Sequence, residues 1–348
     1  MRLVAARLIG VGPFEDVELP FADEAGAPRS VTVIHGGGGV GKTTMLTALA
    51  STRPGYAVLP QVPSGDEPPA VICEWMLGAD DPSRPHSLTV ATPTPTFRVE
   101  ATDAVEAVRR KEQALFDRRA RQGGFAFLAI GATRWFSRQP MSMNAPLRSI
   151  ARYDVRTPAA PDDAARTDLA RETKQAICYA DIAAALSEAG GDRGRHLHRL
   201  GAAMRAALSE VSGLAGFRYR GLDAASFEPT FVDADGRSLS FDELPTRVRH
   251  LVSFAALPVR TLWGAYPGVD PRQAEGVVCI DEVDLHQEPA VISRLLATLC
   301  QALPGVQWIV TSSSAELAAS RDAREVIALR RESGERVELC TGRAALTH

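Results

Sequence analysis

The sequence lacks the features that mark several special classes of protein. No run of about 18 apolar residues occurs, so neither a transmembrane helix nor an export signal is predicted. The five cysteines form no CxxC pair, and their wide spacing favours reduced thiols over a disulfide framework or a zinc site. The expected compartment is therefore the cytoplasm, with no membrane contact.

The sequence also lacks a large excess of either basic or acidic residues. With 39 basic and 42 acidic residues the net charge is −3, so no overall field attracts the chain to nucleic acid or to an anionic membrane. Lysine is scarce, because 36 of the basic residues are arginine and only Lys42, Lys111 and Lys174 are lysine. A chain of 348 residues with 45% apolar content predicts one large folded domain or two small ones.

Strand patterns dominate the N-terminal part of the chain. Residues 2–21 are apolar-rich and are interrupted by turn residues at 10–13, which predicts a β-hairpin. A β-branched run at 30–34 predicts a buried strand, and residues 43–52 have apolar side chains at helical spacing. Residues 56–100 predict an antiparallel β subdomain.

The remainder of the chain predicts alternating strands and helices. A basic helix is expected over 102–122, a buried strand over 125–130, and a helical insertion over 164–214 with a break at 190–194. The segment 275–348 alternates strands with helices, the last of which is expected over 315–323. Such alternation is typical of a mainly parallel sheet flanked by helices with right-handed crossovers, so the predicted fold class is α/β.

A glycine-rich motif follows the strand at 30–34 and opens the helix at 43–52. It matches GxxxxGK[ST], in which glycine lets consecutive N–H groups converge on phosphate oxygens near a helix N-terminus. Lys42 would contact the β- and γ-phosphates of ATP, and Thr43 would ligate Mg²⁺. A chance glycine-rich turn is the alternative. The expected nucleotide contacts are Gly36, Gly37, Gly38, Gly39, Val40, Gly41, Lys42, Thr43 and Thr44.

A second apolar strand, residues 276–280, delivers two adjacent carboxylates at its C-terminal end. In the interpretation we favour, Asp281 holds Mg²⁺ through water and Glu282 polarises the water that attacks the γ-phosphate. Catalysis is thus assigned to Glu282 and Lys42, and metal binding to Thr43 and Asp281. The alternative is that Asp281 and Glu282 only cap the following helix.

These segments resemble a family of ATPases. Residues 281–289 and 307–314 are similar to the Walker B, D-loop and switch segments of ABC-type ATPases in the branch with structural-maintenance-of-chromosomes, RecF-like and overcoming-lysogenisation-defect proteins. The hairpin at 8–21, the glycine-rich motif and residues 127–134 also look like that branch, especially the ATPase subunits of bacterial defence operons such as retron- or Septu-like systems. The resemblance implies a P-loop NTPase fold of ABC-ATPase type over residues 1–348.

Two positions depart from the family pattern. ABC-type ATPases close as head-to-tail dimers in which a signature motif of one subunit caps the γ-phosphate held by the other. Here the glycine position of that motif is occupied by Arg247. A side chain in place of glycine hinders the approach of backbone N–H groups, and impaired closure is favoured over an arginine-finger role. The switch histidine is replaced by Ser313, which predicts slow hydrolysis.

Several further residues are assigned from the resemblance or weighed against simpler interpretations. Asp284 and His286 match the D-loop and are assigned with Arg247 to the dimer site, although His286 fits a solvated loop equally well. The Q-loop glutamine is Gln139 or Gln61, with no pattern to decide between them.

Two basic or histidine-containing patterns remain. His196 and His198 form an HxH without further ligands, so a surface helix is favoured over a metal site. Basic residues on the predicted basic helix make DNA binding possible, but a solvated or protein-docking face is favoured. They are Arg109, Arg110, Lys111, Arg118, Arg119 and Arg121.

The expected function is a dimerising ATP-dependent switch. It would form a homodimer, or a heterodimer with an ABC-type partner, and control a separate effector such as a nuclease or toxin in an anti-phage or toxin-like system. The alternatives are a scaffold that binds ATP without hydrolysing it and a DNA-repair ATPase. The latter is disfavoured because the insertion at 164–214 is too short for a long coiled-coil arm.

Overall fold

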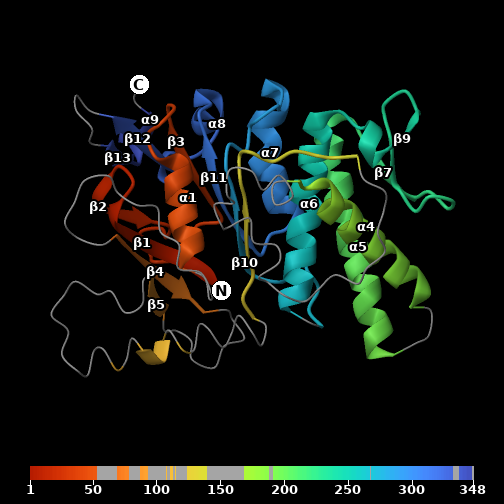
Figure 1. Cartoon of the computed structure of the whole chain (residues 1–348), viewed down its shortest axis with the longest axis horizontal. Coiled ribbons are helices and arrows are strands. Elements are labelled where there is room, and N and C mark those ends of the chain that lie inside the picture. Colours follow the sequence, from red (N-terminus) through yellow and green to blue (C-terminus); the bar gives the residue numbers. More distant parts are fainter. Residues whose placement is uncertain are drawn as a thin grey trace. The chain divides into compact units, whose positions relative to one another are not determined.

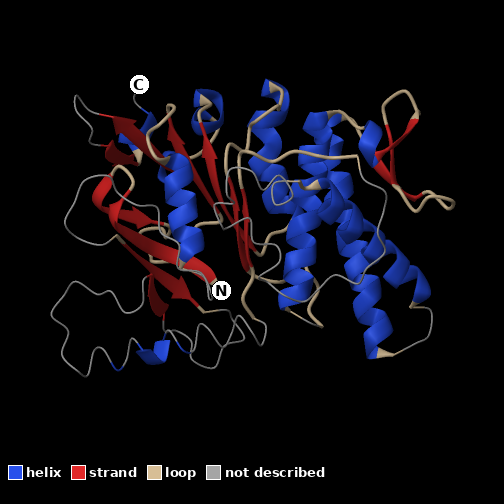
Figure 2. Cartoon of the chain, viewed as in Figure 1, coloured by secondary structure: helices blue, strands red, loops and turns tan. Residues whose placement is uncertain are grey.

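The computed structural model describes residues 1–52, 69–77, 87–92, 124–138, 168–187, 191–266, 268–331 and 337–346, with 107, 110–112 and 114 of a helical segment (Figures 1 and 2). The chain divides into two compact units. Unit 1 comprises Met1–Ala132, Glu275–Val283 and Gln307–His348, and unit 2 comprises Thr133–Ala274 and Asp284–Val306. In this described part, no helix has both the length and the apolar character needed to span a membrane. All five cysteines are free thiols.

Unit 1 contains a four-stranded antiparallel sheet in the order β2-β1-β4-β5. The predicted hairpin is confirmed, since β1 (Arg2–Val11) pairs antiparallel with β2 (Phe14–Pro20). β4 (Ala70–Met76) pairs with both β1 and β5 (Ser87–Thr92) in antiparallel register. The described strands of 56–100 are therefore antiparallel, as predicted, and they share one sheet with the N-terminal hairpin.

The second sheet of unit 1 has six strands in the order β13-β12-β3-β11-β10-β6. β3 pairs in parallel with β11 and with β12, and β10 pairs in parallel with β6, which confirms the mainly parallel prediction. The strands are β3 (Val31–Gly36), β6 (Phe127–Ile130), β10 (Gly276–Ile280), β11 (Val306–Ser312), β12 (Val326–Arg331) and β13 (Val337–Thr341).

The end of this sheet shows one strand direction that the sequence did not predict and corrects the end of one predicted helix. β13 runs antiparallel to β12. The connection between them has too few residues for the crossover that a parallel pair requires. The helix expected over 315–323 ends early, as α8 (Ala315–Ala319), and is followed by the 3₁₀ turn η4 (Ala323–Glu325). Asp322 caps that turn by accepting a hydrogen bond from the Arg324 N–H. α9 (Arg343–Leu346) closes the described chain.

The core of unit 1 is formed around α1 (Lys42–Ser51), which packs against β1, β3 and β4 (Figure 1). Its buried side chains include Met45, Leu46 and Leu49, and they share one apolar cluster with residues of both sheets. Beside them, Trp75 makes edge contacts with Phe125 and Phe127, with ring centroids 5.3 and 5.9 Å apart. This packing fixes the position of α1 relative to the strands of both sheets.

Unit 2 is mainly helical and carries a small antiparallel sheet (Figure 2). The predicted helical insertion forms two helices, α4 (Ala170–Leu186) and α5 (Asp192–Ser212), so the helix resumes slightly before the end of the predicted break. The other described helices of unit 2 are α6 (Thr246–Ala265) and α7 (Pro289–Ala302), with the 3₁₀ turns η2 (Gly213–Ala215) and η3 (Phe241–Glu243).

The three-stranded sheet of unit 2 was not predicted from the sequence. Its strands, in the order β7-β8-β9, are β7 (Arg218–Leu222), β8 (Pro229–Val232) and β9 (Ser238–Ser240). They are short, and aspartate side chains at 223 and 233 accept backbone hydrogen bonds in the two connecting turns. Strands of three to five residues give too weak an alternation pattern to be recognised.

Candidate functional site

The glycine-rich loop joins β3 to α1, as the motif predicts. β3 ends at Gly36, and Gly41 precedes the helix with a φ of +96°, a left-handed conformation that favours glycine. A Cβ on Gly36 would lie 2.7 Å from the Leu329 carbonyl oxygen, and one on Gly41 would lie 2.7 Å from Pro13 Cγ. Packing therefore requires glycine at both ends of the loop.

The middle of the loop is open on its outer side. A Cβ on Gly37, Gly38 or Gly39 would meet no atom of the described chain within 4 Å, so protein packing does not explain why glycine occupies these positions. The N–H groups of residues 38–41 donate no hydrogen bond within the described structure. Successive unpaired N–H groups ahead of a helix form an arrangement suited to an anion such as phosphate.

Lys42 is held within the same loop. Its side chain is buried, and its Nζ donates to the carbonyl oxygens of Gly36 and Gly37 at 2.8 and 2.9 Å. The same nitrogen lies 3.2 Å from Glu282 Oε1. The ammonium is thus placed between the loop and the end of β10.

The structure brings the glycine-rich motif next to the acidic pair, although Thr43 and Asp281 are 238 residues apart in the sequence. Thr43 Oγ1 donates to Asp281 Oδ2 at 2.8 Å, and Thr311 Oγ1 at the end of β11 donates to the other oxygen, Oδ1. Asp281 is buried. Because β3, β10 and β11 are neighbours in one sheet, their C-terminal ends meet at one edge, where open α/β sheets bind ligands.

Glu282 is fixed through both its backbone and its carboxylate. It adopts a left-handed φ of +46°, which is strained for a residue with a Cβ, and its N–H donates to Thr311 Oγ1 at 2.8 Å. Ser313 Oγ donates to Glu282 Oε2 at 2.8 Å. Thr311 and Ser313 therefore orient the acidic pair, a role that the sequence analysis did not assign to either residue.

The oxygen atoms at this sheet edge suit Mg²⁺ better than a metal ion whose ligands all come from protein side chains. Thr43 and Asp281 supply hard oxygen donors, and the described residues contain no group of three or more histidine, cysteine or acidic side chains that could enclose a metal. Mg²⁺ commonly takes one or two protein ligands and completes its shell with water and phosphate oxygens. Thr43 and Asp281 would hold it.

A second cluster of predicted residues lies in unit 2, at the start of α6. Gln287 Nε2 donates to the Arg247 carbonyl oxygen at 3.1 Å, and the Arg247 guanidinium forms an ion pair with Glu288. The Gln287 N–H donates to the Asp284 carbonyl oxygen. His286 has a φ of +65°. The segment that contains Asp284 and His286 thus lies on the first turns of the helix that carries Arg247.

His250 is the buried centre of this cluster. Its ring lies 5.3 Å from that of His286, and its Nδ1 lies 3.3 Å from the Leu285 carbonyl oxygen, which makes Nδ1 the protonated nitrogen. Burial, together with the positive charge of Arg134, lowers the pKa of His250 to about 3. The ring is therefore neutral at physiological pH.

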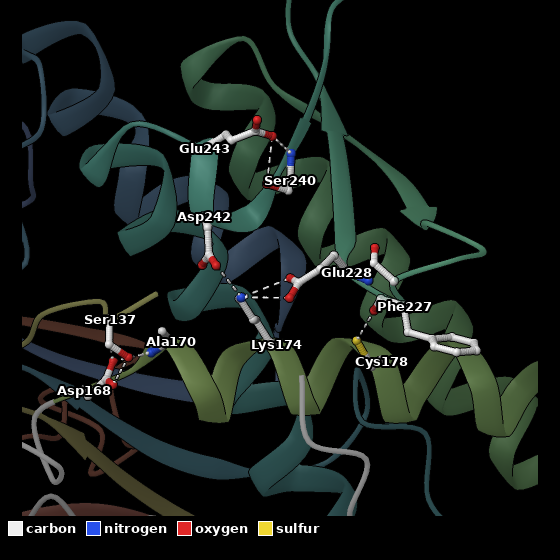
Figure 3. Close-up of polar contacts among 11 residues, drawn as sticks. Ser137, Asp168, Ala170, Lys174, Cys178, Phe227, Glu228, Ser240, Asp242 and Glu243 are labelled. Atoms are coloured by element: carbon white, nitrogen blue, oxygen red, sulfur yellow. Dashed lines mark hydrogen bonds and ion pairs between the residues drawn. The ribbon is translucent and has the colours of Figure 1, made fainter. Parts of the chain in front are cut away.

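A buried lysine anchors the segment that precedes α6 (Figure 3). Lys174 Nζ on α4 lies 3.0 Å from Glu228 Oε1 and 2.7 Å from Asp242 Oδ2, and the lysine side chain is 1% exposed. Asp242 belongs to η3, the turn that leads into α6. The capping box of Ser240 and Glu243 stabilises the same turn. Lys174 thus connects α4, the start of β8 and the entry to α6.

The remaining predicted residues form no site in the described chain. His196 stacks on Trp263 with ring centroids 5.7 Å apart and accepts a hydrogen bond from the Gly268 N–H, which favours a structural role. Arg110 and Lys111 are helical and exposed, whereas the other residues of the basic patch lie outside the described residues. Gln61 and Gln139 also lie outside them.

Solved structures with the same architecture are head domains of structural-maintenance-of-chromosomes (SMC) proteins. An SMC head bound to the C-terminal winged-helix domain of ScpA superposes with a TM-score of 0.57 at 14% identity, covering 98% of this chain and 97% of that one. The chain has the fold of an SMC head domain. The predicted fold class, a P-loop NTPase of ABC-ATPase type, is thereby confirmed.

Two further SMC heads agree with this fold. The head domain from Thermotoga maritima gives a TM-score of 0.51 at 14% identity over 98% of this chain and 99% of that one. A head domain with an extended coiled coil, bound to the C-terminal domain of ScpA derived from Pyrococcus furiosus, gives 0.52 at 13% identity over 98% and 96%.

One curated relative is named as an ATPase. The Retron Ec83 probable ATPase of Escherichia coli is 29% identical over 116 residues, which is 33% of this chain and 21% of that protein. The matched region is therefore a minor part of the relative's length. No protein-family model matches the sequence.

Proposed function

We propose that this chain binds ATP with Mg²⁺ and hydrolyses it slowly, as the nucleotide-dependent switch of a dimer. The observation that carries the proposal is the contact of Thr43 and Lys42 with Asp281 and Glu282, at 2.8 and 3.2 Å. The two halves of the proposed nucleotide site thus lie at one sheet edge. The SMC-head fold and the likeness to a protein named as a probable ATPase support it.

In this proposal the loop and Lys42 bind the phosphates. The unpaired N–H groups of residues 38–41 would donate to phosphate oxygens, and the Lys42 ammonium would exchange its carbonyl partners for them. Thr43 and Asp281 would hold Mg²⁺, which neutralises phosphate charge. Thr311 keeps Asp281 oriented by donating to its second oxygen.

Glu282 is the proposed general base for water. The carboxylate would accept a proton from the attacking water, and the ion pair with Lys42 must loosen before it can do so. Ser313 donates to this carboxylate and, unlike the family's switch histidine, supplies no imidazole. Slow turnover is the expected consequence.

The partner surface that we propose lies at the start of α6. Arg247, Asp284 and His286 would face a second subunit, either an identical chain or an ABC-type partner. Because Glu288 already pairs with the Arg247 guanidinium within one chain, we favour weak closure over an arginine-finger role. Solved SMC heads bound to ScpA domains offer a precedent for a separate partner protein.

The biological setting is inferred from the retron relative. A partner such as a nuclease or toxin, in an anti-phage or toxin-like system, is the effector that we propose. A scaffold that binds ATP without hydrolysis is the second candidate, favoured by Arg247 and Ser313 and disfavoured by the retained Glu282. A DNA-associated ATPase is a third, and duplex DNA should then stimulate turnover in a salt-dependent manner.

The direct test is calorimetry of the full chain with Mg-ATP. Binding should be lost in Lys42→Ala and retained in Lys111→Ala, because Lys111 is an exposed lysine outside the glycine-rich motif. Phosphate release at a low rate separates the switch from the scaffold, which should bind ATP without turnover. The absence of binding by the unmodified chain would refute both.

A further inference from the structure

An arginine outside the glycine-rich motif contacts the phosphate-binding loop. β12 runs parallel to β3 and pairs Leu329 with Gly36, the first residue of the loop. Arg331, the last residue of β12, therefore lies beside the loop. Its Nη2 donates to the Gly39 carbonyl oxygen at 2.7 Å.

This hydrogen bond constrains the orientation of one peptide group. In a trans peptide the Gly39 C=O and the Val40 N–H point in opposite directions, so a donor that holds the carbonyl also directs the N–H. Gly39 has a φ of +75° and open space where a Cβ would be, so the local backbone supplies little restraint of its own. Val40 is buried, and its N–H has no acceptor in the described structure.

The environment of Arg331 suits this role. Its guanidinium has five N–H donors, is exposed, and forms no ion pair with a carboxylate of the described chain. The preceding Arg330 uses its Nη2 for the Ala344 carbonyl oxygen instead. Arg331 thus contacts the phosphate-binding loop, whereas the adjacent Arg330 contacts the C-terminal helix α9.

We propose that Arg331 is a positioning residue that holds the Gly39–Val40 peptide so that the Val40 N–H is presented to a nucleotide phosphate. The identity of the ligand rests on the proposed function, whereas the restraint on the peptide does not. The backbone N–H groups of a P-loop bind the α- and β-phosphates, which ATP and ADP share, so the binding of both nucleotides should depend on Arg331.

The test compares Arg331→Ala, Arg331→Lys and the control Arg330→Ala in the full chain. Loss of one charged hydrogen bond should weaken ATP and ADP binding about tenfold, with partial recovery in Arg331→Lys, which keeps a donor. KM for ATP should rise with little change in kcat. Arg330→Ala should bind both nucleotides like the unmodified chain.

A readout without nucleotide separates this inference from the proposed function. ¹⁵N relaxation should show the order parameters of Gly39 and Val40 falling from about 0.85 towards 0.6 in Arg331→Ala. Unchanged order parameters overturn the inference, and so does equal weakening by Arg330→Ala. If the unmodified chain binds no ATP, the proposed function fails and relaxation alone decides. Arg331→Gln replaces the alanine variant if that variant does not fold.

Discussion

The Lys42 ammonium lies 3.2 Å from Glu282 Oε1 and donates to two carbonyl oxygens of the phosphate-binding loop. One cation is therefore shared between the loop and the carboxylate to which we assign water activation. A bound phosphate would compete with Glu282 for this ammonium. Nucleotide binding and release of the general base are thus coupled in the proposed mechanism.

Replacing Glu282 with glutamine should separate binding from hydrolysis. Glu282→Gln removes the charge that competes for Lys42, so ATP affinity should rise a few-fold while phosphate release falls by about 10² or more. The variant should also accumulate as an ATP-bound dimer, measured by light scattering. Unchanged turnover and unchanged mass would show that Glu282 does not have the assigned role.

Thr311 should affect both stability and hydrolysis through its hydroxyl. Thr311→Val keeps the shape but removes the bonds to Asp281 and to the Glu282 N–H, which should cost about 1–3 kcal/mol of unfolding free energy per unsatisfied group. Thr32→Val is the matched control, because Thr32 is also buried in this sheet but its hydroxyl has no hydrogen-bond partner among the described residues. Urea unfolding should show a lower unfolding free energy for Thr311→Val but not for Thr32→Val. Thr311→Val should also have a lower ATPase rate.

Stability should decrease below about pH 6.5 because of His250. Its pKa is about 3 in the folded chain against an ordinary value of 6.5, so between these values the unfolded chain binds the extra proton. The free energy of unfolding therefore decreases by up to about 1.4 kcal/mol for each pH unit as pH falls through this window. Above the window His250 has no such effect. Arg134, His286 and Arg249 add to the unfavourable field around the ring.

The His250 prediction is checked by denaturant unfolding between pH 7 and pH 4. His250→Asn keeps a donor for Leu285 but cannot titrate, and should show a smaller loss than the unmodified chain. The exposed His198→Asn should behave like the unmodified chain. Identical pH profiles for the His250→Asn variant and the unmodified chain would contradict the prediction.

Lys174 should be a stability determinant of unit 2. Lys174→Met leaves Glu228 and Asp242 without their shared partner, which should cost about 3–5 kcal/mol. Adding Glu228→Gln and Asp242→Asn to this variant should restore much of the loss, since no charge is then left unpaired. Urea unfolding measures both, and a triple variant as unstable as Lys174→Met would exclude the charge explanation.

The fold could be predicted from local patterns wherever a strand or helix was long and regular. β3, α1 and β10 lie close to their predicted bounds, since a buried strand and an amphipathic helix each have a characteristic spacing. The β7–β9 sheet and the antiparallel β13 escaped prediction. Short strands carry weak alternation, and strand direction depends on the connection rather than on the strand's own residues.

Some residues of the candidate site could likewise be recognised from the sequence, whereas others could not. Lys42, Thr43, Asp281 and Glu282 belong to motifs of fixed spacing, so they could be recognised without a structure. Their common location, and the roles of Thr311, Ser313 and Arg331, depend on which strands are neighbours in the six-stranded sheet. No local pattern predicts such contacts.

By itself, the sequence determined a strand, a glycine-rich turn and a helix ahead of Lys42, and an apolar strand ending in two carboxylates, because backbone geometry and hydrophobic burial act over a few residues. Only the tertiary structure decided that Thr311 holds both acidic residues, that Ser313 donates to Glu282 and that Arg331 holds the Gly39 carbonyl. Each of these contacts joins residues in, or just after, different strands of the six-stranded sheet, so the order and packing of those strands set the distances.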